Sequence, residues 1–353
     1  MAERGKEELG QEIPPPASDP IFIVGMNGSG TTLVLNSLGR QSTLYGFPGE
    51  SQIIPRFILK LHRYGSLLDD ANYLALWTDI RTSYPFRRYN NGAPVPLPSG
   101  WQSHPRTLAA VFDGVFGYFA RAQGKSRWCE KTPMNALHIE RLAATFPRSR
   151  FIHVIRDGRD CAVSLKRRMK YVPELTMYRW KRVVREARRQ GTLIGDRYLE
   201  LRYEEVTAEP EHWFQQVCAF IEVSFEEGIV SPPQDGTARR NPTYHIIKKG
   251  PIVHDGLRWP SELSPDEIAS LDRIGGHLLI ELGYEAGDDA NDLDPSRYAR
   301  AKMALLGYGG EAIRGAKRLM GNVQLPIRAR VQSLVGRGWT QIRWWITNRR
   351  SAS

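Results

Sequence analysis

A glycine-rich segment near the start of the chain has the residue types that bind phosphate groups. The segment IFIVGMNGSGTTLVLNSL, residues 21–38, runs from β-branched and aromatic residues through three glycines into a helix-compatible apolar pattern. A strand, a glycine turn and a helix N-terminus in that order offer backbone N–H groups to an anion. The residues expected to bind it are Asn27, Gly28, Ser29, Gly30, Thr31 and Thr32.

The same segment departs from the loop that binds nucleoside triphosphates. The spacing from Gly25 to Gly30 matches the first part of that loop, but Thr31 stands where the triphosphate loop has lysine. That lysine offsets the charge of the β- and γ-phosphates. We therefore expect the loop to hold one phosphate, or a phosphate with one small anionic substituent, without a metal.

A second junction, FIHVIRDGRDCAVSLKRR from Phe151, suits another phosphate. It predicts a buried strand that ends at Arg156 and a helix that carries Ser164 about two turns along. An arginine fork with a hydroxyl is good chemistry for binding a phosphate. Two phosphate sites at neighbouring strand ends indicate a ligand that is phosphorylated at both ends of its ribose.

The elements that must position these residues alternate along the chain. Apolar runs predict strands at 21–25, 127–130, 150–155 and 198–203, and helical patterns occupy 31–39, 134–146, 159–170, 176–190, 209–221 and 265–282. This alternation predicts an α/β fold, a P-loop-type three-layer sandwich with a central parallel sheet and helices on both faces. Ligands of such sheets bind at the carboxyl ends of the strands.

We divide the chain into three parts. Residues 1–19 lack the apolar core of a signal peptide and are expected to form a flexible leader. Residues 20–290 form the α/β domain, in which the aromatic, proline-rich stretch 40–125 interrupts the alternation and is expected to face the acceptor substrate. Residues 291–353 form a basic, partly amphipathic helical tail.

The net charge of +11 resides in that tail. Residues 297–353 hold twelve Lys or Arg and one acid, so the rest of the chain is balanced. A nucleic-acid enzyme usually has its basic patch on the folded body, so we do not expect a nucleic-acid partner. Apolar residues at helical spacing between arginines in 326–350 favour contact with an anionic membrane surface; the alternatives are an oligomerisation helix and a disordered basic tail.

Composition also bears on the cellular setting. Three separated cysteines argue against a disulfide framework or a paired-cysteine metal site, and no apolar run is long enough to cross a bilayer. We expect a cytoplasmic protein that can attach to the inner face of the membrane through its tail.

Four motifs in order resemble those of the sulfotransferases that use 3′-phosphoadenosine 5′-phosphosulfate (PAPS). FIVGMNGSGTT resembles their 5′-phosphosulfate loop, and VIRDGRDCAVS resembles their 3′-phosphate motif, with Arg156 and Ser164. LELRYEEVTAEP and GHLLIELGYE are similar to the downstream pattern. The resemblance covers residues 20–285 and implies that the donor co-substrate is PAPS, that the acceptor group is a hydroxyl, and that no metal is needed.

Two further segments resemble the tyrosylprotein branch of that family, here of a soluble bacterial type. GESQIIPR is similar to the branch's GEETRIIPR, and CEKTP is similar to its NKDP. The resemblance implies that Glu50 removes the acceptor proton and that Lys131 steadies the leaving phosphate. It also assigns Lys249 to the donor's phosphates and Tyr203 to its adenosine side.

One position departs from the family pattern. Most relatives have Lys or Arg where this chain has Gly28, and that cation touches the transferring group. Lys131 must then bear more of the leaving-group charge, or Lys249 or Arg56 must substitute; otherwise the protein has low activity or none. Some relatives use histidine as the base, for which His104 is the alternative.

Three questions stay open at this point. The acceptor is a protein tyrosine, a glycan or a lipid-linked glycan. One rival function is a P-loop kinase-like phosphotransferase, which Thr31 and the second phosphate site disfavour. The other is a non-catalytic basic binding protein with a decayed donor site.

Overall fold

The computed structural model describes residues 19–231, 252 and 256–296. The predicted leader, apart from Asp19, and the predicted tail beyond Ser296 lie outside the described residues, as does Lys249. Residues 291–294 contact the body of the domain. Lys181 pairs with Asp292 and Asp294 at 3.2 and 2.9 Å, and the carbonyl of Asp272 accepts the N–H of Asn291.

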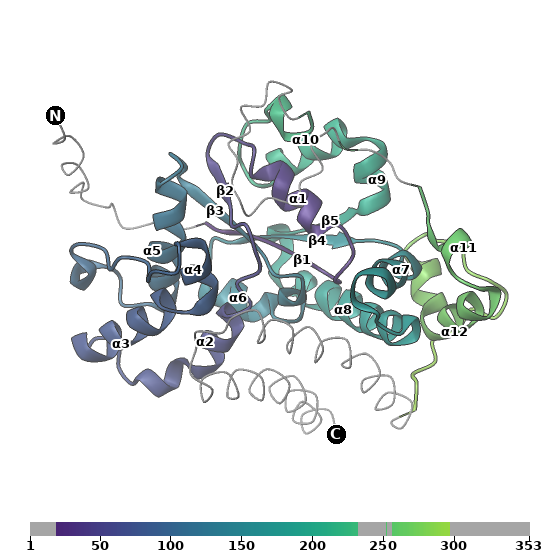
Figure 1. Cartoon of the computed structure of the whole chain (residues 1–353), viewed down its shortest axis with the longest axis horizontal. Helices are drawn as coiled ribbons and strands as arrows, with labels where there is room; N and C mark the ends of the chain where they lie inside the picture. Colours follow the sequence, from purple (N-terminus) through teal and green to yellow (C-terminus); the bar gives the residue numbers. More distant parts are fainter. Residues whose placement is uncertain (1–18, 232–251, 253–255, 297–353) are drawn as a thin grey trace.

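A five-stranded parallel sheet forms the centre of the protein (Figure 1). The strand order is β2-β3-β1-β4-β5. The strands are β1 (Ile21–Gly25), β2 (Leu44–Gly46), β3 (Arg127–Lys131), β4 (Arg150–Ile155) and β5 (Tyr198–Arg202). Together with helices on both faces, this confirms the predicted three-layer α/β sandwich.

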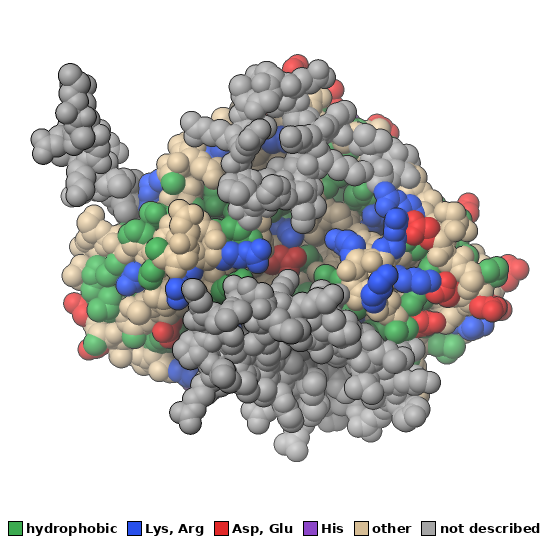
Figure 2. Space-filling view, viewed as in Figure 1, with side chains coloured by type: hydrophobic (Ala, Val, Ile, Leu, Met, Phe, Trp, Pro, Cys, Tyr) green, Lys and Arg blue, Asp and Glu red, His purple; other side chains and the backbone are tan. Residues whose placement is uncertain are grey.

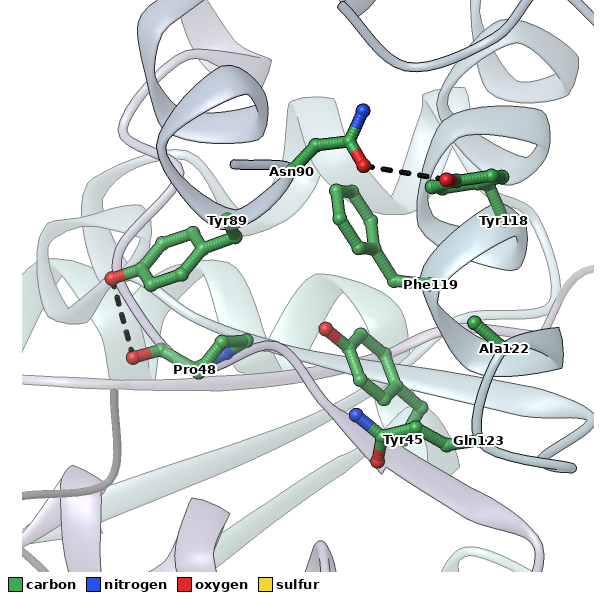
Figure 3. A pocket seen from close by; sticks show the side chains of 8 residues that line it. All are labelled: Tyr45, Pro48, Tyr89, Asn90, Tyr118, Phe119, Ala122 and Gln123. Carbon is green, nitrogen blue, oxygen red and sulfur yellow. Dashed lines mark hydrogen bonds between the residues drawn. The ribbon is translucent and has the colours of Figure 1, made fainter. Parts of the chain in front are cut away.

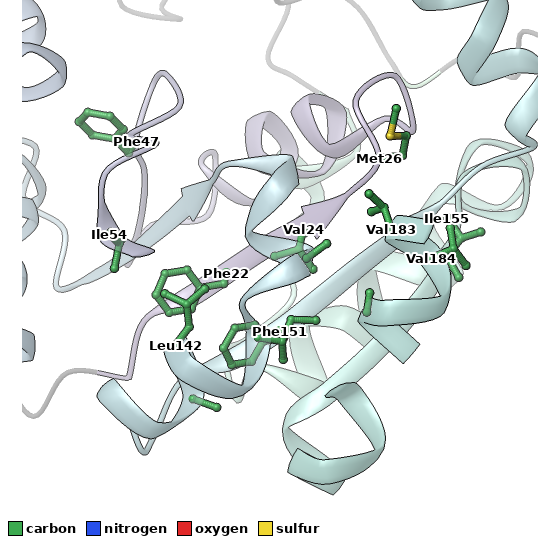
Figure 4. Packing of buried hydrophobic residues seen from close by; sticks show 14 of the residues in the cluster. Phe22, Val24, Met26, Phe47, Ile54, Leu142, Phe151, Ile155, Val183 and Val184 are labelled. Carbon is green, nitrogen blue, oxygen red and sulfur yellow. The ribbon is translucent and has the colours of Figure 1, made fainter. Parts of the chain in front are cut away.

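Side chains that alternate along the strands build one core on each face of the sheet. Ile21 and Ile23 pack in the core beneath one helical layer, whereas Phe22 and Val24 pack in the core of the other, as the period of two in a strand requires. Figure 4 shows Phe22 and Val24 with Phe151 in the larger core. All four β1 side chains are fully buried, so β1 is held rigidly from both faces.

Helices from different parts of the chain supply the two layers. The smaller core includes residues of α1 (Thr31–Leu38), α9 (Tyr203–Ala208) and α10 (Pro210–Phe220). The larger core includes residues of α5 (Leu108–Arg121), α6 (Ile139–Thr145), α7 (Gly158–Met169), α8 (Pro173–Ile194) and α12 (Pro265–Glu281).

The insertion, residues 40–125, contributes the edge strand β2 and a group of helices beside it (Figure 1). Its helices are α2 (Ile54–Lys60), α3 (Asp70–Arg81), α4 (Tyr84–Tyr89) and α5, with 3-10 turns η1 (Leu61–Tyr64) and η2 (Trp101–Ser103). Aromatic side chains pack this region together; the ring of Phe47, just after β2, contacts those of Phe86 and Phe116 at 5.6 and 5.2 Å between centroids.

Several element boundaries differ from the predictions. The helix predicted at 134–146 is a 3-10 turn η3 (Pro133–Leu137) followed by α6, and the pattern at 209–221 is preceded by the separate helix α9. Ser264 caps α12, because its side chain accepts the N–H of Glu267 while the Glu267 carboxylate accepts the N–H of Ser264. The remaining short elements are η4 (Gly195–Arg197), η5 (Glu227–Ile229) and α11 (Trp259–Glu262).

None of the helices in the described part of the chain combines the length and the apolar character needed to cross a membrane.

Candidate active site

The ends of three neighbouring strands carry the predicted site residues. β1 lies between β3 and β4, and all three run parallel. β1 leads into the glycine loop, β3 ends at Lys131, and Arg156 follows β4. Chain order also reverses at β1, since β2 and β3 lie on one side of it and β4 and β5 on the other. Ligands of open α/β sheets bind at such a reversal, outside the carboxyl ends of the strands.

The loop after β1 turns through left-handed backbone at two glycines. Gly28 has a φ of 97° and Gly30 a φ of 100°, in the region that residues with a Cβ rarely adopt. Gly30 immediately precedes α1, so the N–H groups of Thr31 and Thr32 start the helix without acceptors in the preceding turn. With the half-buried Asn27, the loop forms a cradle of backbone donors.

The three hydroxyl side chains of this loop differ in their surroundings. Ser29 is fully buried; its Oγ has no hydrogen-bond partner among the described residues and lies 2.8 Å from where a Cβ on Gly25 would be. Its N–H donates to the carbonyl of Met26 at 3.0 Å. Thr31 is also buried, whereas Thr32 is exposed. Ser29 thus lies beneath the loop, and Thr32 is the hydroxyl residue at its surface.

Arg156 lies just before α7 and is held there by an ion pair and an aromatic ring. Its Nη2 donates to Asp160 Oδ2 at 2.7 Å, and its guanidinium lies over the ring of Tyr203, 4.2 Å from the centroid. Its Nε is buried and has no hydrogen-bond partner in the described ranges. Asp160 was not predicted as a site residue, although it follows Arg156 by four residues, the spacing of a helical ion pair. A buried cation with a spare donor suits an anionic ligand.

The glycine loop and the Arg156 junction touch each other. A Cβ built on Gly28 would lie 3.4 Å from the carbonyl oxygen of Cys161 and 3.5 Å from Cβ of Ser164. A Cβ built on Gly30 would overlap the ring of Tyr203. The glycine loop after β1 therefore lies directly against α7 and the beginning of α9, which carry predicted donor residues.

Side chains distant in sequence hold the backbone around Arg156. Trp180 Nε1 donates to the Arg156 carbonyl at 2.9 Å. Glu204 Oε1 accepts the N–H of Asp157 at 3.0 Å, and Tyr284 donates its hydroxyl to the other oxygen at 2.9 Å. Burial raises the pKa of Glu204. No local pattern indicated these roles, because each partner comes from a different helix or loop.

Glu50 and Lys131 form an ion pair at the end of β3. Lys131 Nζ lies 3.1 Å from Glu50 Oε1, and Gln52 Nε2 donates to Glu50 Oε2 at 2.7 Å. The Lys131 side chain is 9% exposed and that of Glu50 is 28% exposed, so both are reachable at the rim but shielded from bulk water. Behind this pair lies the fully buried carboxylate of Glu130, which was not predicted as a site residue.

The alternatives named from sequence have different surroundings. Arg56 is exposed on α2. His104 is buried against the ring of Trp77, at 5.9 Å between centroids, and this burial lowers its pKa. Within the described ranges, no group of three or more His, Cys, Asp or Glu side chains is placed to hold a metal ion.

A hollow of about 270 Å³ lies beside the edge strand β2 (Figure 3). Its lining includes Tyr45, Tyr89 and Phe119, and Tyr89 donates its hydroxyl to the Pro48 carbonyl at 3.4 Å. It contains none of the predicted site residues. It reaches the segment that leads to Glu50 through Pro48 and Tyr89.

The surface over α7 is cationic. The last turn of this helix carries Lys166, Arg167 and Arg168, and Figure 2 shows lysine and arginine side chains gathered over α7. Positive potential near a site of this kind increases the encounter rate with anionic ligands.

Comparison with known proteins adds independent information. The model of the sulfotransferase family matches residues 20–227. Protein-tyrosine sulfotransferase 1 of Danio rerio is 27% identical over 194 residues, which are 50% of this chain and 52% of that protein. Carbohydrate sulfotransferase 1 of the same organism is 27% identical over 103 residues, 28% of this chain and 24% of that protein. The chain thus spans about half or less of the length of these relatives.

A solved structure shares the fold. The sulfotransferase domain from the curacin biosynthetic pathway aligns with a TM-score of 0.51 and 19% identity, over 77% of this chain and all of that domain.

Proposed function

Because the chain belongs to the sulfotransferase family, we propose that it transfers the sulfuryl group of PAPS to an acceptor hydroxyl and releases adenosine 3′,5′-bisphosphate. The observation that carries the donor assignment is the contact between the glycine loop and the Arg156 junction. These are two anion-binding features on adjacent strands, as a nucleotide with phosphates at both its 5′ and 3′ positions requires.

The residues at this contact fit the two ends of such a donor. The loop from Asn27 to Thr32 would hold the 5′-phosphosulfate with backbone N–H groups and the exposed hydroxyl of Thr32. Arg156 and Ser164 would hold the 3′-phosphate, for which the Nε of Arg156, without a partner in the described part of the chain, is a spare donor. Tyr203 would contact the nucleoside between them.

The reaction requires a base on the acceptor and positive charge on the leaving group. Glu50 takes the proton of the acceptor hydroxyl while the oxygen of that hydroxyl forms a bond to sulfur. The bond from sulfur to the 5′-phosphate oxygen breaks, and its electron pair remains on that oxygen, where Lys131 neutralises the charge. The 3.1 Å pair keeps both groups at one point of the rim before the substrates bind.

The glycine at position 28 changes how the transferring group is stabilised. Gly28 lies against Cys161 and Ser164 and has a left-handed backbone, so a larger cationic residue would be strained there. We propose that Lys131 takes the larger share of the charge, with Arg56 or Lys249 as further sources. Lys131 is placed first because it is already paired with Glu50.

The acceptor is proposed only as a hydroxyl of a protein tyrosine, a glycan or a lipid-linked glycan. The relatives are named for tyrosine and for carbohydrate acceptors, which keeps these classes together. Incubation with radiolabelled PAPS and extracts separated into protein, glycan and lipid would identify the acceptor by the fraction that takes the label.

Calorimetry tests the donor site directly. Adenosine 3′,5′-bisphosphate should bind, and adenosine 5′-monophosphate should bind about 10- to 100-fold more weakly, because it lacks the group that Arg156 contacts and charge-assisted hydrogen bonds contribute about 1.5–3 kcal/mol. Equal affinity for the two nucleotides, or no heat with the bisphosphate, would contradict the assignment. Binding and turnover of magnesium ATP would indicate a phosphotransferase instead.

A further inference from the structure

Glu130 is a buried carboxylate that links the segment containing Glu50 to the strand end that carries Lys131. It lies on β3 immediately before Lys131 and is fully buried. Its hydrogen-bond partner Ser51, from the insertion, follows Glu50 directly in the chain. An isolated carboxylate in such a place is costly unless it is well hydrogen-bonded.

Four hydrogen bonds satisfy this carboxylate. Oε1 accepts the N–H of Ser51 at 3.0 Å, the hydroxyl of Ser51 at 2.8 Å and the hydroxyl of Thr132 at 2.5 Å. Oε2 accepts from Asn135 Nδ2 at 3.0 Å. Burial raises the pKa of Glu130, and the bonds from Thr132 and Ser51 oppose this effect. All four groups can donate, so the ionised carboxylate has a hydrogen-bond donor on each of its oxygens.

The segment that Glu130 holds has an unusual backbone. Gln52 has a φ of 57°, in the left-handed region that strains a residue with a Cβ. Its N–H donates to Thr132 Oγ1 at 3.2 Å, and its side chain donates to Glu50. The Thr132 hydroxyl therefore links Gln52 to Glu130. A strained residue persists when its surroundings over-determine its conformation, as they do here.

From these contacts we infer that Glu130 is a positioning residue. It ties the turn at 50–52 to the end of β3 and so holds Glu50 against Lys131 in the geometry that the proposed transfer uses. The inference rests on the proposed function for its catalytic consequence, but the tie itself can be tested without turnover.

Hydrogen–deuterium exchange tests the tie. In Glu130→Gln, one oxygen is replaced by an amide that faces the donor Asn135 Nδ2. The peptide containing Ser51 and Gln52 should exchange about 10-fold faster than in the wild type, while peptides from α1 and α7 stay unchanged. Unchanged protection of residues 50–53 would overturn the inference, whether or not any sulfuryl transfer is detected.

Turnover tests the consequence and separates positioning from mere stability. Glu130→Gln should lower kcat about 10- to 100-fold and leave the Kd for adenosine 3′,5′-bisphosphate within about threefold, at a temperature where circular dichroism shows folded protein. Asp113→Asn is the matched control, since Asp113 is also a buried carboxylate and accepts from Trp128 Nε1 at 2.9 Å. An equal loss of kcat in this control would show that Glu130 contributes stability alone.

A second pair of variants remains informative if Glu130→Gln does not fold. Ser51→Ala removes one hydrogen bond on the Glu50 side, and Asn135→Ala removes one on the far side. We expect Ser51→Ala to lower kcat about 3- to 10-fold and Asn135→Ala to change it less than twofold. Equal effects of the two variants would contradict the inference. If the wild type does not bind adenosine 3′,5′-bisphosphate, that result would instead contradict the proposed donor site.

Discussion

The two halves of the proposed active site, a donor half and a transfer half, are built by different means. The donor half, at the ends of β1 and β4, consists of backbone donors and helix starts, with Arg156 fixed by Asp160 and Tyr203. The transfer half, at the end of β3, consists of the single side-chain pair Glu50–Lys131. In the donor half, the fold places the binding groups directly. In the transfer half, a network of hydrogen bonds has to hold them.

This difference has consequences for how each half responds to change. Most substitutions leave a backbone N–H donor in place, since only proline lacks it. The donor half should therefore weaken gradually as single contacts are lost. The transfer half depends on one side chain, Glu50, as the proposed proton acceptor. It should therefore fail abruptly when that side chain is removed or displaced. The predictions below test that contrast, beginning with the largest expected effect.

Glu50→Gln tests the transfer half. Removing the proton acceptor should lower kcat about 10²- to 10⁴-fold, the usual range for a positioned general base. The Kd for adenosine 3′,5′-bisphosphate should stay within about threefold, because no donor residue is changed. Steady-state kinetics with labelled PAPS and calorimetry provide the two measurements, and turnover at the wild-type rate would exclude Glu50 as the base.

Arg156→Lys tests the donor half. The ammonium can still pair with Asp160 but has no second donor in the plane of the lost guanidinium. We expect bisphosphate affinity to fall about 10- to 100-fold, which corresponds to a charge-assisted bond of about 1.5–3 kcal/mol. Calorimetry measures this, and the exposed Arg189→Lys on α8 is the control. If Arg156→Lys instead lowers kcat with unchanged affinity, Arg156 acts in the transfer step and not in donor binding.

Gly28→Ala tests whether the loop itself forms the donor cradle. Gly92→Ala is the matched control, because Gly92 also has a left-handed φ, of 83°, but no atoms lie within 4 Å of the point where its Cβ would be. Both variants should lose about 1–2 kcal/mol of unfolding free energy through backbone strain, measured by urea unfolding. Only Gly28→Ala should also weaken bisphosphate binding. An equal change of affinity in both variants would show that the loop does not bind the donor.

His138 allows a pH-dependent test of the segment that follows the transfer half. This residue separates η3 from α6, and burial, together with Arg141, lowers its pKa from 6.5 to about 4. Since the folded pKa is below the unfolded one, the stabilising effect is present above pH 6.5 and is lost as pH falls towards 4. We expect His138→Gln to remove about 1 kcal/mol of that pH dependence, because His138 keeps some solvent contact.

Urea unfolding at pH 7, 5.5 and 4 measures this effect, with exposed His212→Gln as the control. A pH profile that is identical in His138→Gln and the wild type would mean that His138 does not contribute. A change in the bisphosphate affinity of His138→Gln above pH 6.5 would show that the donor half also depends on this residue.

The sequence predicted the donor half better than the transfer half for a physical reason. β1, β4, α1 and α7 are set by local apolar runs and glycines, and their bounds are close to the predicted ones. The three-residue strand β2 was missed because Leu44–Gly46 has too short an apolar run to indicate a strand. The adjacency of Glu50 and Lys131 came from the family resemblance, and nothing in their spacing of 81 positions required it.

Buried polar residues were the least predictable. Glu130 was passed over because its partner Ser51 is 79 positions away. Lys181 lies on the arginine-rich helix α8, yet it is 2% exposed and pairs with Asp292 and Asp294. Charge alone predicts solvent exposure, and only the folded chain reveals a distant counter-ion.

The first glycine of the loop has a consequence for protein engineering. A Cβ on Gly25 would lie 2.5 Å from the carbonyl oxygen of Val154 on the adjacent strand, and Gly25 is paired with that residue in the sheet. The shape of the loop is therefore partly a property of its neighbour. A designer who wishes to transplant this glycine loop into another scaffold would have to move β4 along with it.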